Sequence, residues 1–391
     1  MRLSSNTRFT LLMLLLLGLL TTYAGCGGRD LLGDVKNLLG DLFGPKTPRM
    51  EYRRLAEKEN LVAERDLALW DTAYHIAKTS PLTVNLPHRE LLHLDERLIL
   101  SAQAMRMTVE PGRRLSIRFD TEELFWFGEL YAIRNGKPAK RPLEVLDAKL
   151  GNMVFENNQR GAVELLFVLQ SGPLTSLKCE LQMTTKPVIS FPVMGKDERA
   201  IRSKWGVPRD GGRRRHEGND IFAPKGTNLL AVVSGEVTRL TETGIGGKTV
   251  WLYDRKRNLR YYYAHLDRQL VRKGDYVERG DVVGTVGNTG NARTTPPHLH
   301  FGIYAGGAID PFPFLRDADA VPPSSPLHPR AAAQLMNVPK SGNHYLRFTP
   351  ERDGAKIRQL ENGEEVTALG VTGRFWRVKT GRGEIGYANF D

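Results

Sequence analysis

Between about residues 190 and 315, hydrophobic and polar positions alternate in short stretches separated by glycine-rich turns. Successive side chains of a β-strand point to opposite faces, so this alternation predicts strands with one buried face. The stretches are 229–233, 235–240, 249–253, 259–265 and 281–286. Together with the long segments between them, they predict an antiparallel β domain with long loops.

The same patterns divide the rest of the chain into helical and β-rich regions. Charged residues with interspersed leucines over 51–78 predict an amphipathic helix. Alternating stretches around a turn at 110–113 predict an all-β module of sandwich or barrel type. The predicted fold class is therefore mainly β and multidomain. We expect a signal peptide over 1–25, a tether and helical segment over 26–90, a β accessory module over 91–190, the central β domain over 191–317, a proline-rich linker over 318–335 and a small barrel over 336–391.

The N-terminus has the features of a secretory signal. Arg2 and Arg8 precede an apolar run of about a dozen residues, which is too short to span a bilayer comfortably. The run ends in Ala24-Gly25-Cys26, which is similar to the lipobox of bacterial lipoproteins, where the cysteine is acylated. Plain cleavage is the alternative, because Tyr23 stands where that motif usually has leucine. A cysteine lipid anchor at Cys26 would place the chain in the cell envelope.

The second cysteine and the charge balance add two constraints. Cys179 falls on the apolar phase of an alternating stretch, so we expect a buried thiol and no structural disulfide. The formal net charge of +12 suits an anionic partner. No helix-turn-helix, zinc finger or RNP motif is present, so we predict no nucleic-acid partner; a wall polymer or lipid head groups would be attracted by the same charge.

Four histidines and one carboxylate are the candidate chemistry of the central domain. His298 and His300 lie two apart in a predicted strand and so project to one face. His216 and Asp220 flank a predicted turn that can bring both side chains onto one ion, and His265 ends an aromatic strand. A catalytic zinc takes three protein ligands and keeps a fourth position for water. Two histidines and one carboxylate meet that need, and the remaining imidazoles suit proton transfer and oxyanion binding.

These residues resemble a known family. His216-x-x-x-Asp220, Ala264-His265-Leu266 and His298-Leu299-His300-Phe301 are similar to the motifs of lysostaphin- and LytM-type (M23) zinc peptidases, which are peptidoglycan endopeptidases. The resemblance covers about 120 residues. It implies that His216, Asp220 and His300 hold Zn²⁺, that His298 is the general base and that His265 stabilises the transition state. Degenerate members of the family lack metal ligands; every position is filled here, which favours an active enzyme.

The C-terminal strands resemble bacterial SH3-like domains. The resemblance lies in Trp376-Arg377-Val378 and in Gly386-Tyr387. Trp376 and Tyr387 either line a groove for wall peptide or glycan, or belong to the core of the barrel.

We therefore expect an exported, lipid-anchored zinc metalloendopeptidase that hydrolyses peptide bonds of peptidoglycan. Gly27 rather than Asp after the cysteine fits an outer-membrane or periplasmic position if the source is Gram-negative. The first alternative is a wall-binding or regulatory lipoprotein, an activator of another hydrolase, whose intact site is occluded by the preceding module. The second is a zinc peptidase that acts on proteins rather than on the wall.

Overall fold

The computed structural model describes residues 47–94, 101–121, 123, 126–146, 151–327 and 334–391. The chain forms two units, Met1–Leu61 and Val62–Asp391. The signal segment and Cys26 lie outside the described residues. None of the helices in the described ranges is both long and apolar enough to cross a membrane.

The single helix expected over 51–78 is two helices. Helix α3 (Pro48–Lys58) starts at Thr47, whose hydroxyl accepts a hydrogen bond from the Met50 amide. It ends just before Asn60, whose φ of 50° is the left-handed conformation that often terminates helices. Helix α4 (Glu64–Thr79) then belongs to the second unit. The prediction of one continuous helix was wrong because a single asparagine adopts a conformation incompatible with its continuation.

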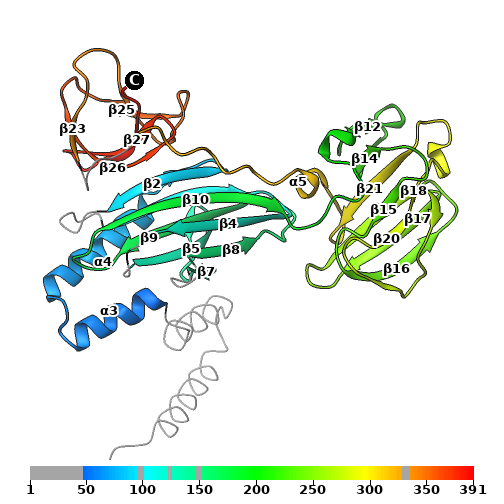
Figure 1. The fold of residues 1–391 in the computed structure, drawn as a ribbon, viewed down its shortest axis with the longest axis horizontal. Coiled ribbons are helices and arrows are strands. Elements are labelled where there is room, and N and C mark those ends of the chain that lie inside the picture. The colour runs from blue at the N-terminus through cyan, green and yellow to red at the C-terminus, as the bar shows by residue number, and fades with distance from the viewer. Residues whose placement is uncertain (1–46, 95–100, 122, 124–125, 147–150, 328–333) are drawn as a thin grey trace, which may run out of the picture. The chain divides into compact units, whose positions relative to one another are not determined.

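The accessory module consists of two sheets with a common core (Figure 1). One sheet contains β1 (Leu82–Thr83), β3 (Ala102–Val109), β9 (Val163–Ser171), β5 (Trp126–Arg134), β6 (Lys137–Pro138) and β7 (Glu144–Val145). The strands β2 (His88–Leu94), β10 (Leu177–Pro187), β4 (Arg113–Asp120) and β8 (Asn152–Glu156) lie side by side in the other. Cys179 on β10 is buried in this core, as expected for an apolar thiol.

The small C-terminal barrel extends the second of these sheets. Its strands are β23 (Leu335–Asn337), β24 (Tyr345–Arg347), β25 (Lys356–Gln359), β26 (Glu365–Thr372), β27 (Phe375–Thr380) and β28 (Ile385–Ala388). Strand β26 pairs with β2, with Leu92 opposite Gly370. A Cβ atom at Gly370 would lie 2.7 Å from the carbonyl oxygen of Leu91, so glycine permits this close approach. Strand β2 starts at His88, three residues before the expected start of the module at 91.

A buried ion pair lies at this junction. Glu90 on β2 accepts two hydrogen bonds from the Arg377 guanidinium, at 2.6 and 2.7 Å, and one from the Tyr387 hydroxyl at 3.2 Å. All three side chains are fully buried. Tyr387 is therefore a core residue, the second of the two alternatives raised by the sequence, and presents no surface to a ligand. Trp376 is half-buried and packs against the core of the barrel.

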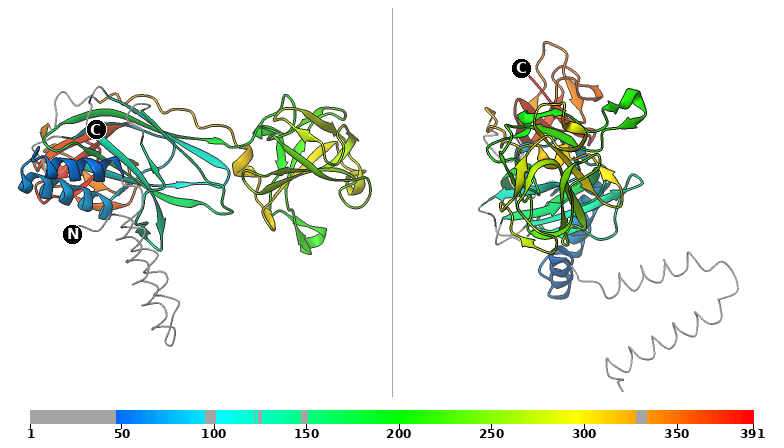
Figure 2. Two further views of the ribbon diagram at one scale, coloured as in Figure 1. Left: turned by 90° about the horizontal axis from the view of Figure 1, so that it is seen from below. Right: turned by 90° about the vertical axis from the view of Figure 1, so that its right-hand side faces the viewer.

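The central domain is an antiparallel sheet, as the alternation predicted. Its main strand order is β11-β14-β21-β18-β17-β16-β19, and β15, β20 and β22 pair alongside. The strands curve around a core of buried aliphatic and aromatic residues (Figure 2). Their bounds are β11 (Ile201–Ser203), β14 (Asn219–Phe222), β15 (Asn228–Leu230), β16 (Gly235–Thr241), β17 (Lys248–Asp254), β18 (Leu259–Gln269), β19 (Tyr276–Val277), β20 (Val282–Val286), β21 (His298–Tyr304) and β22 (Ala308–Ile309). A separate hairpin is formed by β12 (Pro208–Arg209) and β13 (Arg214–Arg215).

Candidate metal centre and active site

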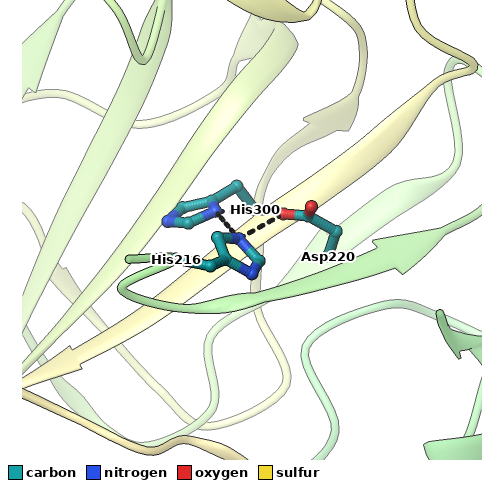
Figure 3. Close-up of side chains that lie close together, drawn as sticks. All are labelled: His216, Asp220 and His300. Atoms are coloured by element: carbon teal, nitrogen blue, oxygen red, sulfur yellow. Dashed lines mark hydrogen bonds and ion pairs between the residues drawn. The ribbon is translucent and has the colours of Figure 1, made fainter. Parts of the chain in front are cut away.

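Neighbouring strands bring the candidate ligands together (Figure 3). Asp220 on β14 lies opposite His300 on β21, and His300 lies opposite Ala264 on β18. His216 precedes β14 in the turn after β13. Gly218 lies between His216 and Asp220, and its lack of a side chain lets this turn pass close to β21. A Cβ atom at Gly218 would lie 2.7 Å from Nε2 of His300 and 2.6 Å from the Phe301 carbonyl oxygen.

The three candidate ligand atoms form an equilateral triangle. The distances His216 Nε2–Asp220 Oδ1, His216 Nε2–His300 Nδ1 and His300 Nδ1–Asp220 Oδ1 are each 3.0 Å. In a tetrahedral zinc site with bonds of about 2.0–2.1 Å, neighbouring ligand atoms stand about 3.3 Å apart. One ion placed over the triangle would thus reach all three atoms with little movement. Among the described residues, this is the one cluster of at least three possible ligands close enough to hold a metal.

The hydrogen bonds of His216 leave one of its ring nitrogens directed at the metal position. Nδ1 of His216 lies 2.9 Å from the carbonyl oxygen of Lys204, which can only accept, so Nδ1 carries the proton. The Nε2 lone pair of a neutral His216 therefore faces the Asp220 carboxylate. Even if His300 donates from Nδ1, the contact between His216 and Asp220 remains one acceptor against another. A cation between them removes that repulsion, so the residues fit a bound Zn²⁺.

The carboxylate and one imidazole have shifted pKa values. Burial alone would raise the pKa of Asp220, but in the metal-free site hydrogen bonds and charge from protonated His216 and His300 outweigh it and hold the pKa well below its usual range. Burial lowers the pKa of His300, against the opposing effect of Asp220. Both shifts favour the forms that bind metal, an ionised carboxylate and a neutral imidazole.

Asp220 is held from its other side by an arginine that the sequence did not single out. Nη2 of Arg209 donates to Oδ2 of Asp220 at 2.7 Å and to the Ser203 hydroxyl oxygen at 2.7 Å. Ser203 lies opposite Asp220 in the pairing of β11 with β14. Arg209 is eleven residues before Asp220 in a strand of only two residues, so no periodicity in the sequence connects them.

His298 lies beside the metal triangle with its acceptor nitrogen toward it. Its Nδ1 donates to the Pro296 carbonyl oxygen at 2.9 Å, which leaves a lone pair on Nε2. That Nε2 lies 3.9 Å from Oδ1 of Asp220. The ring stacks on Phe222, with centroids 5.1 Å apart, and this contact fixes its orientation.

His265 reaches the same pocket through an irregularity in its strand. Its φ is 64°, and the pairing of β18 with both β17 and β20 shifts register close to it. Its Nδ1 donates to the Thr289 carbonyl oxygen at 2.9 Å. Burial, with added repulsion from His298 and His300, lowers the pKa of His265 to about 4. The ring lies 5.1 Å from that of His298, measured between centroids.

These five residues line one open pocket of about 390 Å³. Its wall comes entirely from residues 203–300 of the central domain, and within the described part of the chain neither the accessory module nor the barrel contributes to it. An extended peptide can therefore reach the metal position from this face.

Replacing Gly218 by alanine is expected to weaken Zn²⁺ binding by roughly 10-fold or more. The added methyl group collides with the His300 ring and with the Phe301 carbonyl group, so the ligand turns away from the triangle. Titration against a competing chelator measures the affinity. Gly161→Ala is the matched control, because Gly161, like Gly218, has no positive φ but has no atom within 4 Å of its Cβ position. Equal affinities for wild type and Gly218→Ala would show that His300 accommodates the methyl group.

Two segments of the chain match models of known protein families. Residues 214–311 match the model of peptidase family M23, and residues 342–389 match that of the bacterial SH3 domain. The L-Ala–D-Glu endopeptidase of Bacillus subtilis is 36% identical over 140 residues, which are 32% of this chain and 43% of the relative. The peptidoglycan DD-endopeptidase ShyC of Vibrio cholerae is 36% identical over 103 residues, 26% of this chain and 22% of the relative.

Among solved structures, the catalytic domain of lysostaphin from Staphylococcus simulans is 34% identical, with a TM-score of 0.27. The match covers 29% of this chain and 89% of that domain. The chain spans less than half the length of the two relatives named above.

Proposed function

We propose that this protein is a zinc-dependent peptidoglycan endopeptidase, because residues 214–311 match the model of peptidase family M23 and residues 342–389 match that of the bacterial SH3 domain. The observation that carries the proposal is the triangle of His216, Asp220 and His300, whose three ligand atoms are each 3.0 Å apart. With His216 neutral, as metal binding requires, its Nε2 lone pair faces the Asp220 carboxylate, and a cation between them removes the repulsion. His216, Asp220 and His300 would hold Zn²⁺.

Zn²⁺, when bound, supplies Lewis-acid polarisation of the scissile carbonyl group and lowers the pKa of a water molecule to about 7. His298 takes the proton of the attacking water on Nε2, because its Nδ1 is already committed to Pro296. As the C–N bond breaks, the same proton passes to the leaving amine nitrogen. The stack of His298 on Phe222 keeps its acceptor nitrogen directed at the reacting atoms.

We assign His265 to hydrogen bonding with the carbonyl oxygen that becomes negative. Its Nδ1 donates to Thr289, so its Nε2 becomes a donor only when the ring carries a second proton. The pKa of about 4 withholds that proton in the resting site. That second proton has to be taken up from solvent when the substrate binds, because the proton of the attacking water goes to His298 and then to the leaving amine.

Peptidoglycan as the substrate follows from three features. Two relatives are named for cleavage of L-Ala–D-Glu bonds and for peptidoglycan DD-endopeptidase activity. A bacterial SH3 domain commonly accompanies wall hydrolases, and the net charge of +12 attracts an anionic polymer. Half-buried Trp376 remains a candidate wall contact in that domain.

We further propose that the protein is exported and anchored by acyl chains on Cys26, in the outer membrane or periplasm if the source is Gram-negative. The support is the apolar leader ending in Ala24-Gly25-Cys26. Mass spectrometry of the mature protein from its own envelope tests the anchor. We expect Cys26 as the first residue with the mass of its lipid; an unmodified mature N-terminus contradicts this part alone.

The decisive experiment is digestion of purified peptidoglycan by the zinc-loaded mature chain, followed by mass analysis of the fragments. We expect uncrosslinked or shortened stem peptides, and no release after chelation or with His300→Ala. Restoring Zn²⁺ should restore release by the wild type only. The fragment masses name the bond that is cut.

The alternatives predict other outcomes of the same experiment. A wall-binding or regulatory lipoprotein would hold Zn²⁺ and bind the wall without releasing fragments. A peptidase specific for proteins would cut unfolded polypeptides and leave the wall intact. The pocket wall, built from the central domain alone, favours the enzyme.

A further inference from the structure

The two oxygen atoms of Asp220 have different partners. Oδ1 lies 3.0 Å from both His216 Nε2 and His300 Nδ1 and so faces the metal position. Oδ2 accepts a 2.7 Å hydrogen bond from Arg209 and is turned away from the triangle. The Asp220 side chain is buried to nine-tenths. The environment therefore distinguishes the two oxygens before any metal binds.

This difference matters for metal chemistry. A carboxylate can bind a metal ion through one oxygen or through both, and binding through both raises the coordination number. A catalytic zinc needs three protein ligand atoms and one open position. If Oδ2 also reached the ion, it would occupy the space that a water molecule or the scissile carbonyl oxygen needs.

The guanidinium of Arg209 is suited to prevent this. A charge-assisted hydrogen bond to a carboxylate is short and strong, and the planar guanidinium fixes its direction. The same nitrogen donates to Ser203 Oγ, on the strand that pairs with the strand of Asp220. Arg209 is thus bound at a fixed position on the sheet, and Oδ2 is held there with it.

We propose that Arg209 is a positioning residue that holds Asp220 in one-oxygen coordination of Zn²⁺ and so keeps the fourth metal position open. The inference rests on the zinc site of the proposed function. It assigns a role to an arginine outside the ligand and histidine set. Arg209 is one-third exposed and lines the pocket, so its side chain can be changed without opening the hydrophobic core.

The test replaces Arg209 by glutamine and by lysine in the full chain and measures metal binding rather than hydrolysis. We expect Arg209→Gln to lose about 10- to 100-fold in Zn²⁺ affinity, the range found when partners of metal ligands are removed. Arg209→Lys keeps the charge but lacks the planar guanidinium that fixes the direction of the hydrogen bond, so it should recover part of the loss.

Cobalt substitution adds a direct reading of coordination. Tetrahedral Co²⁺ absorbs visible light more strongly than five-coordinate Co²⁺. We expect the wild type loaded with Co²⁺ to show the strong tetrahedral bands, and Arg209→Gln to show weaker bands because Oδ2 joins the ion. A residue that only supports the β12–β13 hairpin would change stability and leave these bands as they are.

Two controls accompany the measurement. Arg199→Gln removes one positive charge from the same domain at an exposed ion pair with Asp197. It should leave affinity and spectrum unchanged, which separates a specific effect from a change in net charge. Ser203→Ala removes the second partner of Arg209, and we expect a smaller shift in the same direction. Thermal melting of the metal-free chains identifies any variant that fails to fold.

The possible outcomes distinguish the role of Arg209 from the proposed function. Wild-type affinity and wild-type cobalt bands in both Arg209→Gln and Arg209→Lys overturn the inference and leave the proposed function standing. If Arg209→Gln does not fold, Arg209→Lys decides by the same two readings. If the Arg209 variants differ from wild type in Zn²⁺ affinity and Co²⁺ bands as expected, but the wild type cuts no peptidoglycan, only the proposed function is contradicted. A wild type that binds neither Zn²⁺ nor Co²⁺ overturns both.

Discussion

Replacing His298 by alanine is expected to slow peptidoglycan cleavage by about 10²- to 10⁴-fold while one zinc ion stays bound per chain. His298 makes none of the three contacts that define the metal triangle; its Nε2 lies 3.9 Å from Asp220 Oδ1. Its loss therefore removes a proton acceptor and leaves the metal ligands in place. Release of soluble fragments gives the rate, and metal analysis of the same sample gives the zinc content.

The comparison with His265→Ala separates the two imidazoles. Each donates from Nδ1 to a backbone carbonyl group, so each presents an acceptor on Nε2. Their roles differ in distance from the ligands and in environment, because His265 is held by Thr289 and His298 by Pro296 and Phe222. If His298 is the base, an external amine or imidazole should partly rescue His298→Ala more readily than His265→Ala.

His75→Ala is the matched control for both variants. His75 is an exposed histidine on α4, a helix of the second unit that contributes nothing to the pocket. Its replacement should change neither zinc content nor rate. Loss of zinc from His298→Ala would contradict the division between ligands and base. An unchanged rate would remove His298 from the chemistry.

The central fold and the set of candidate residues could both be predicted from the sequence. Alternation over strands such as 249–253 and 259–265 reports which face is buried, and the sheet has the expected antiparallel pairing. His298 and His300 needed only the two-residue period to be placed on one face. The chain has only 9 histidines, and His216, His265, His298 and His300 all fall in the central domain, so their chemistry is visible without coordinates.

His265 shows where alternation fails. The two-residue period puts it on the face of Tyr261 and Tyr263, which are fully buried in the core. The positive φ and the register shift turn its side chain instead to the pocket, beside Tyr262 and Ala264. A bulge of this kind re-aims a side chain at a functional site, and no residue preference in the strand announces it.

The role of Arg209 and the β2–β26 junction could not be predicted from the sequence for another reason. Both depend on pairing between segments far apart in sequence, and a single sequence contains no record of such pairing. Glu90 and Arg377 each read as ordinary charged strand residues, yet they meet across 287 positions in a fully buried ion pair. The predicted boundary between helical segment and module, at 90 and 91, consequently falls within β2.

Replacing Glu90 by glutamine is expected to weaken the junction of β2 and β26 by about 3–5 kcal/mol. Arg377 is fully buried and donates to both carboxylate oxygens of Glu90, so the neutral amide leaves its charge without a counter-ion. Hydrogen–deuterium exchange of peptides covering the two strands measures the change locally. Their protected amides should exchange about 10²-fold faster or more, since each 1.4 kcal/mol is a factor of ten.

Two companion variants make this result specific. Glu180→Gln removes a part-exposed carboxylate paired with Arg89 on the same sheet, and it should cost at most about 1 kcal/mol. The double change Glu90→Leu with Arg377→Met removes both charges together. It should recover much of the stability, because the burial cost of the ions disappears along with their attraction.

The pH dependence of hydrogen exchange tests the same ion pair a second time. Burial raises the pKa of Glu90, but the charge and hydrogen bonds of Arg377, with a hydrogen bond from His88, outweigh it and lower the pKa from 4.5 to about 2. A carboxyl group whose pKa is lower in the folded state stabilises the fold above its unfolded pKa. That stabilisation is lost as the pH falls from about 4.5 towards 2. Exchange at the junction should therefore accelerate in wild type over this range, after correction for intrinsic rates, and Glu90→Gln should lack that component. Equal pH dependence in the two proteins would show that the ion pair does not hold the barrel to the module.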